Sequence, residues 1–139
     1  MFWIEPDEVV LLGHALDGVE SVEIDRRATR LAMEWGDAGP HAVFADAPEQ
    51  RVDVRITRRL EGGDGAFEAS VAPGAAGELS FAAGAAGSDA GRVRVVASVV
   101  VTAVEHGLRA GGCAQQRILC VAVSSDGASD PVTITKEGA

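Results

Sequence analysis

Residues 91–107, GRVRVVASVVVTAVEHG, decide the fold of this chain. The segment begins with alternating polar and apolar residues and then becomes apolar on both faces. Valine favours an extended strand, and a strand with two apolar faces is covered on both sides by its own domain or by a neighbouring subunit. The segment therefore predicts a central β-strand, and Val96 and Val100 are candidates for a subunit interface. Ser98 and Thr102 interrupt its apolar run, which is too short to span a bilayer, so we expect no membrane partner.

A period of two recurs on both sides of this segment. In RVDVRIT, residues 51–57, the side chains of Val52, Val54 and Ile56 point to one face and the polar residues point to the other. Similar strand-like runs occupy residues 21–26, 29–35, 67–71, 78–82, 115–125 and 131–135. Repeated short alternating runs are typical of an all-β domain.

Glycine, proline and Asp-Gly pairs separate these runs, and such turn signals recur roughly every ten to fifteen residues, as in β-sandwiches and barrels. The chain has 139 residues, 17 glycines and no tyrosine, and its length suits one domain. We therefore predict a single mainly β domain, residues 1–139, of two packed antiparallel β-sheets in a sandwich-like or barrel-like arrangement. At most one short helix is expected, at residues 48–50 or 105–110.

The formal net charge of -9 argues against specific nucleic-acid binding, because an acidic surface repels phosphate. Cys113 and Cys120 are too few and too far apart for a known zinc or redox motif, so we expect two buried free thiols. The N-terminal residues carry neither a basic region nor a long apolar run, and therefore do not resemble a signal peptide. Folding in a cytoplasm is the expectation.

Catalytic and metal-binding patterns are missing from the sequence. His14, His41 and His106 each lie in a turn-like setting, and none has metal-ligand spacing with another histidine or a carboxylate. The chain also lacks a G-x-S-x-G nucleophile motif, and its glycine-rich segments lack the lysine of a phosphate-binding loop. The loop SSDGASD, residues 124–130, does not follow the calcium-loop pattern. We expect no enzyme activity, no cofactor and no metal.

Two further features leave alternatives open. Arg51 and Arg55 share a strand face with Asp53, so this mixed face is either solvated or in contact with an acidic patch of another subunit. The segment between Trp35 and Val52 is predicted to be a long loop that carries Phe44. This aromatic side chain either packs under its own domain or anchors a contact between subunits.

The C-terminal half resembles the tail tube proteins of tailed bacteriophages and phage-like particles. The resemblance rests on the order of four segments: a hairpin at residues 73–83, the apolar strand that ends in VVVTAVEHG, the run QQRILCVAVSSDG, and SDPVTIT at residues 129–135. The opening HALDGVESVEIDR, residues 14–26, is also similar to an early strand of such proteins.

The resemblance implies a compact fold of two packed sheets with a short helix. Such subunits assemble with themselves and with other tail proteins into stacked hexameric rings, in the host cytoplasm and then in the virion tail. The lumen conducts DNA without specific binding, which suits an acidic subunit. The candidate interface residues are Phe44, Arg51, Arg55, Val96, Val100, Asp126, Asp130, Val132 and Ile134. The candidate lumen residues are Glu20, Glu23, Asp25, Asp53 and Glu68.

Within this resemblance, the C-terminal strand of residues 132–135 is expected to pair in a sheet near the ring interface, with the loop of residues 126–130 packing on a neighbour. Other functions are compatible with a β-rich acidic domain. The first is another virion component, such as a tail terminator, a distal tail ring or a decoration protein. The second is a stand-alone β-sandwich binding module, for example for carbohydrate, although the absence of tyrosine disfavours sugar stacking.

Overall fold

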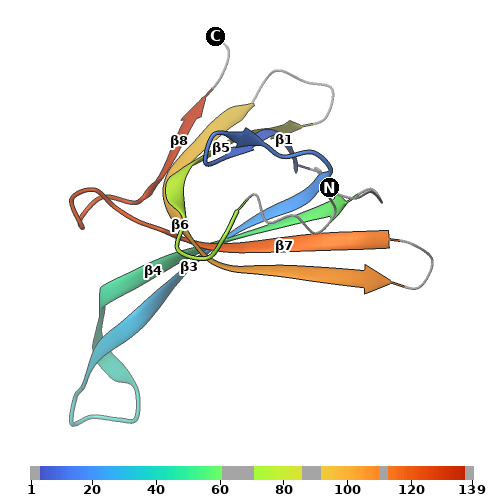
Figure 1. The fold of residues 1–139 in the computed structure, drawn as a ribbon. Coiled ribbons are helices and arrows are strands. Elements are labelled where there is room, and N and C mark those ends of the chain that lie inside the picture. Colours follow the sequence, from blue (N-terminus) through green and yellow to red (C-terminus); the bar gives the residue numbers. More distant parts are fainter. Residues whose placement is uncertain (1–3, 61–70, 86–91, 110–112, 137–139) are drawn as a thin grey trace.

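The computed structural model describes residues 4–60, 71–85, 92–109 and 113–136. These residues form one antiparallel sheet of eight strands and contain no helix (Figure 1). The strands are β1 (Ile4–Leu11), β2 (His14–Ala15), β3 (Val19–Trp35), β4 (Ala42–Leu60), β5 (Ala76–Ala85), β6 (Val93–Arg109), β7 (Cys113–Ala122) and β8 (Val132–Lys136). The predicted mainly β, antiparallel class is confirmed.

The strand order is β2-β1-β5-β6-β7-β4-β3, with β8 paired to β6. Strand β6 explains why there is one sheet where two were predicted. Its first half, Val93–Ala97, lies between β5 and β8, whereas its second half pairs with β7. A register shift between Val101 and Ala103 marks a bulge in this second half, and bulges bend a strand and increase its twist. The single long strand therefore joins regions that would otherwise form separate sheets.

The sheet curls around its own hydrophobic core (Figure 1). Alternate residues of the central strands point to this inner face, and the most completely buried large side chains include Ile56, Leu79, Val99, Val101 and Ile118. Burial of one such side chain contributes about 1.5–3 kcal/mol. The predicted inward face of residues 52–56 is thus confirmed. In the run of residues 115–125, Ile118, Cys120 and Ala122 are buried, whereas Leu119 and Val121 are half-buried.

Three sequence expectations about local structure are wrong. Residues 48–50 belong to β4 and residues 105–109 to β6, so neither segment is helical. In the segment of residues 105–109, pairing with β7 gives hydrogen-bond partners to the backbone groups that face that strand. Strands β1 and β2 were not predicted, although β1 pairs with β5 and supplies the buried side chains of Val9 and Leu11. The predicted strand at residues 67–71 lies outside the described residues except for Val71, which is buried.

The predicted loop between Trp35 and Val52 is mostly strand. Strand β4 begins at Ala42, so the connection to β3 spans only residues 36–41. The register of the β3–β4 pair shifts around residues 28–32 of β3, opposite a segment of β4 that contains Pro48. Proline removes one hydrogen-bond donor from the ladder, and the ribbon bends and leaves the body in this region (Figure 1).

Candidate functional site

The outer part of the β3–β4 ribbon, residues 31–46, is called the arm below. All of its residues are exposed, and Figure 1 shows it projecting from the body. Its large apolar side chains are unusually open: Leu31 is 63% exposed, Trp35 58% and Val43 73%. Contiguous exposed apolar surface of this kind marks an interaction site.

The strand register divides the arm into two faces. Ala32 pairs with Asp46 and Glu34 pairs with Phe44, so these four residues form what we call the acidic face. Leu31, Met33 and Trp35 alternate with them and form the apolar face. The arm contains three carboxylates, Glu34, Asp37 and Asp46, and no lysine or arginine.

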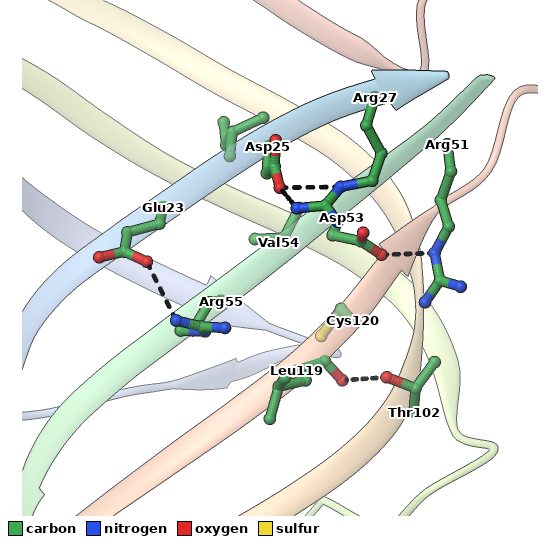
Figure 2. Close-up of a pocket in the computed structure, with 11 residues that line it drawn as sticks. Glu23, Asp25, Arg27, Arg51, Asp53, Val54, Arg55, Thr102, Leu119 and Cys120 are labelled. Atoms are coloured by element: carbon green, nitrogen blue, oxygen red, sulfur yellow. Dashed lines mark hydrogen bonds and ion pairs between the residues drawn. The ribbon is translucent and has the colours of Figure 1, made fainter. Parts of the chain in front are cut away.

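The body carries a hollow on the outer side of the sheet, across β3, β4, β7 and β6 (Figure 2). The hollow has a volume of about 640 Å³. Leu119 and Thr102 contribute to its lining, and the Thr102 hydroxyl donates a hydrogen bond to the Leu119 carbonyl oxygen at 3.1 Å. This outer hollow combines an apolar patch with charged walls, and so differs from the dry inner core.

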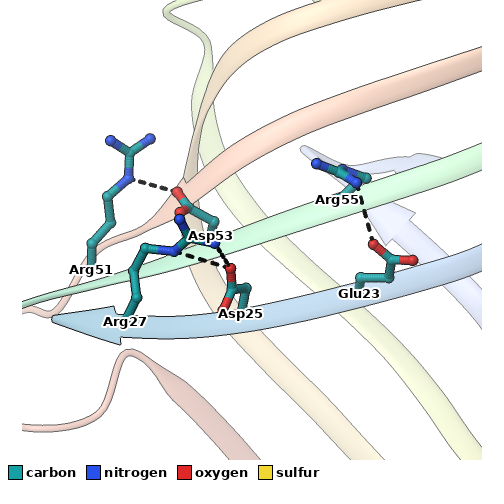
Figure 3. Close-up of polar contacts among 6 residues, drawn as sticks. All are labelled: Glu23, Asp25, Arg27, Arg51, Asp53 and Arg55. Atoms are coloured by element: carbon teal, nitrogen blue, oxygen red, sulfur yellow. Dashed lines mark hydrogen bonds and ion pairs between the residues drawn. The ribbon is translucent and has the colours of Figure 1, made fainter. Parts of the chain in front are cut away.

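Three ion pairs form the charged walls of the outer hollow (Figure 3). Arg55 lies 3.6 Å from Glu23 across the two strands, whereas the Arg51–Asp53 pair, at 2.6 Å, and the Arg27–Asp25 pair each lie within one strand. A hydrogen bond to Asp25 raises the pKa of Arg27.

The two ion pairs within single strands, Arg27–Asp25 and Arg51–Asp53, offset a repulsion between like charges that the β3–β4 register creates. Asp25 is directly opposite Asp53, and Arg27 is directly opposite Arg51. Like charges in directly opposed positions destabilise a sheet. Each of these four side chains instead contacts the opposite charge two residues away in its own strand. As a result the outer hollow is balanced in charge.

The candidate lumen residues do not share one environment. Three of them lie together on the outer face: Glu23, Asp25 and Asp53. Each is paired with an arginine, so this face does not have the net negative charge that was expected of a lumen surface. Glu20 accepts a long hydrogen bond of 3.5 Å from Gln115. Glu68 lies outside the described residues.

The candidate interface valines of β6 also lie on the outer face. Val96 and Val100 are half-buried, whereas the alternating Val95, Val99 and Val101 are buried in the core. Val100 is directly opposite Val121 of β7, which is half-buried as well. The chain covers one face of β6 completely and the other face only in part.

The C-terminal loop folds onto its own chain. Asp126 accepts hydrogen bonds from the backbone of Ser129 and Ala128 and from the hydroxyls of Ser129 and Ser124. The Ser129 backbone bond contributes most to lowering the pKa of Asp126. Asp130 accepts from the Val132 backbone at 3.0 Å and from Arg26 at 3.1 Å, and the Val132 bond is the main cause of its lowered pKa. The loop is therefore held at the base of the β3–β4 ribbon.

Strand β8 follows this loop and pairs with β6. Val132 is buried, whereas Ile134 is 58% exposed. The two candidate interface residues of this strand thus differ: Val132 already packs within its own chain, and only Ile134 offers apolar surface.

A buried polar network was not predicted. Gln116 is 2% exposed; it accepts from Arg58 Nε at 2.7 Å, and its amide nitrogen lies 3.2 Å from Nε2 of His106. Gln116 continues the inward series of Ile118 and Cys120, so the alternation alone could have placed it inside. Burial also raises the pKa of the Cys120 thiol to about 11.

Only part of the arm was predicted as an interface, because Phe44 was a candidate contact residue. Leu31, Met33 and Trp35 lie in the predicted strand of residues 29–35 and were not proposed as an interface. Among the described residues, no group of three or more histidine, cysteine or acidic side chains could hold a metal ion. In the same part of the chain, no helix could cross a membrane.

No protein-family model matches this chain, and no curated protein matches its sequence.

Proposed function

We propose that this protein is a self-assembling structural subunit of the tail-tube type. Its copies form hexameric rings that stack into a tube, and the lumen conducts DNA. The observation that carries the proposal is the arm, because an isolated ribbon with Leu31, Trp35 and Val43 more than half exposed becomes favourable when a neighbouring copy covers it.

Two features of the body support self-assembly. Among the described strands, β3 pairs only with β4 and β8 pairs only with β6, so each offers an edge to a neighbouring copy, and closing a ring removes such edges. The outer face of β6 and β7 is half-buried and carries Val96, Val100 and Val121. In this proposal, the curled sheet serves as the two-layered body of the ring, and its partly covered valines lie against neighbouring copies.

The charge of the chain agrees with a passage through which DNA slides. The net charge is -9, and the outer arginines Arg27, Arg51 and Arg55 are held by carboxylates. Such a surface offers few free cations to phosphate. We place the protein in the virion tail, with assembly in the host cytoplasm and other tail proteins as further partners.

Negative-stain electron microscopy of the purified chain over a range of concentrations tests this proposal. Rings or tubes are expected. Single rings that never stack would favour a tail terminator or a distal tail ring, and a monomer at every concentration would contradict self-assembly and favour a binding module.

The arm is tested by the triple substitution Leu31→Ser, Met33→Ser and Trp35→Ser. These side chains are exposed, so we expect a folded monomer with an unchanged β circular-dichroism spectrum and no tubes. Leu108→Ser is the matched control, because Leu108 is 67% exposed and lies on β6, outside the arm. Tubes that persist in the triple variant would remove the apolar face of the arm from the assembly interface.

A further inference from the structure

The acidic face of the arm has a definite chemical character. Phe44 is 51% exposed and is directly opposite Glu34, while Asp46 is directly opposite Ala32. Asp46 lies two residues from Phe44 on the same face of β4, so Phe44 has one carboxylate, Glu34, across the ribbon and a second one along its own strand. A complementary surface needs an apolar patch with more than one cation beside it.

The outer hollow has these properties. Leu119 and Thr102 line it on the side of β7 and β6, whereas Arg55 lies at one end and Arg27 and Arg51 lie at the other (Figures 2 and 3). An arginine beside an aromatic ring adds a favourable cation–π contact. The volume of about 640 Å³ leaves ample room for one phenyl side chain.

The arginines can change partners at small cost. The side chains of the Arg55–Glu23 pair are 49% and 62% exposed, and those of Arg51–Asp53 are 49% and 31% exposed. Exposed ion pairs of this kind contribute about 0–1 kcal/mol. A guanidinium of the outer hollow can therefore exchange one carboxylate partner for another at small cost.

We infer that the acidic face of the arm, with Phe44 at its centre, docks into the outer hollow of a second copy of this chain. Phe44 packs on Leu119, and Glu34 and Asp46 pair with Arg55 and Arg51. The inference rests on the proposed function, since it specifies where an assembling copy receives the arm. Because each chain has one arm and one outer hollow, the contact is heterologous and propagates from copy to copy.

A charge swap tests the contact. Asp46→Arg and Arg51→Glu are each expected to raise the protein concentration needed for tube formation at least tenfold, as measured by sedimentation. Arg51 is directly opposite Arg27, so a glutamate at this position meets no like charge across the ribbon. The double variant should return to within about threefold of the wild type, because the ion pair is rebuilt with reversed sign. Asp17→Arg is the control, with the same charge change at an exposed turn residue, and should leave assembly unchanged.

Cysteine cross-linking provides a second readout that does not depend on the charge swap. Phe44→Cys and Thr102→Cys are combined with Cys113→Ser, while Cys120 is kept because it is buried. Mild oxidation of assembled protein should give a ladder of linked chains on a non-reducing gel, and either cysteine alone should give no ladder.

The outcomes separate the two proposals. The docking site would be overturned, and the proposed function would stand, if the wild type forms tubes but both specific tests fail. In that case the effects of the two charge substitutions on the concentration needed for assembly would add in the double variant, and oxidation would give no ladder. A wild-type chain that never assembles would overturn both. Rescue in the double variant, or a ladder that requires both cysteines, would support the contact.

Discussion

The two ends of the β3–β4 ribbon have similar apolar residues but opposite environments. At the body end, Val54 and Ile56 of β4 are 1% and 0% exposed. In the arm, Val43 of the same strand is 73% exposed. The body end of β4 alternates polar and apolar residues, whereas residues 42–45 of the arm are all apolar. The arm is therefore no less apolar than the body end, and composition does not cause the difference.

The cause is the number of neighbouring strands. Strand β7 pairs with β4 from Leu60 to Val52, and beyond that point β3 is the only neighbour of β4 among the described strands. A ribbon of two strands has no layer to pack against, and an isolated hairpin is marginally stable in water. An apolar alternation therefore identifies a face that will be covered, but the topology decides whether the same chain covers it.

The largest expected effect is at the body end. Ile56→Ala should reduce the free energy of unfolding by about 2–5 kcal/mol, because it leaves a cavity in a closed core. Leu31→Ala in the arm should change it by less than about 0.5 kcal/mol, as for other exposed positions. Urea denaturation of the monomer measures the free energy of unfolding of both variants. Equal decreases in this free energy would contradict the contrast between body and arm.

The reaction rate of a cysteine thiol is expected to differ between the buried body and the exposed arm. Burial raises the pKa of Cys120 from 9.0 to about 11, so the thiolate fraction at pH 8 falls about a hundredfold, and the thiolate is the reactive form. In a Cys113→Ser background, Cys120 should react with a thiol reagent at least a hundred times more slowly than a cysteine at Phe44. Similar rates in the native protein would mean that the body opens as readily as the arm.

A glycine at the body end gives a smaller, local effect. Gly18 has a φ of +72°, and a Cβ atom there would lie 2.4 Å from the Arg59 carbonyl oxygen. Gly18→Ala should therefore destabilise the protein by about 1–3 kcal/mol. Gly13→Ala is the control, with a φ of +83° and open space around it, and should cost about 1 kcal/mol. Unfolding midpoints in urea would show whether the ribbon is fixed at this contact.

The smallest effect concerns the loop at the base of the ribbon. Hydrogen bonds, chiefly from Ser129, lower the pKa of Asp126. The stabilisation from its charged form is complete above about pH 4, the ordinary range of aspartate, and declines as the pH falls toward the lowered value. Protection of the Ala128 and Ser129 amides against hydrogen exchange, followed by NMR, should weaken only below pH 4.

In the Asp126→Asn variant, this amide protection should be reduced at every pH, whereas Asp17→Asn should leave it unchanged. Protection that is independent of both pH and the carboxylate would show that the loop is ordered by its packing alone.

The sequence predicted some site residues better than others. The outward positions of Arg51, Asp53 and Arg55 followed from the period of two. The pairs within each strand join residues two apart on one face, a spacing that the sequence already shows. The ion pair between Glu23 and Arg55 could not be predicted, because it depends on the register that sets these two residues opposite each other. Phe44 was identified as a candidate, although it was assigned to a loop.

The sequence by itself determined that this chain is a β-protein with one face of each central strand buried, because side chains alternate along every strand and the hydrophobic effect requires the apolar set to leave water. Only the tertiary structure decided that β6 joins the regions into one sheet, and that Leu31, Trp35 and Val43 remain exposed. Strand neighbours are set by contacts between residues far apart in the chain, and no local pattern contains that information.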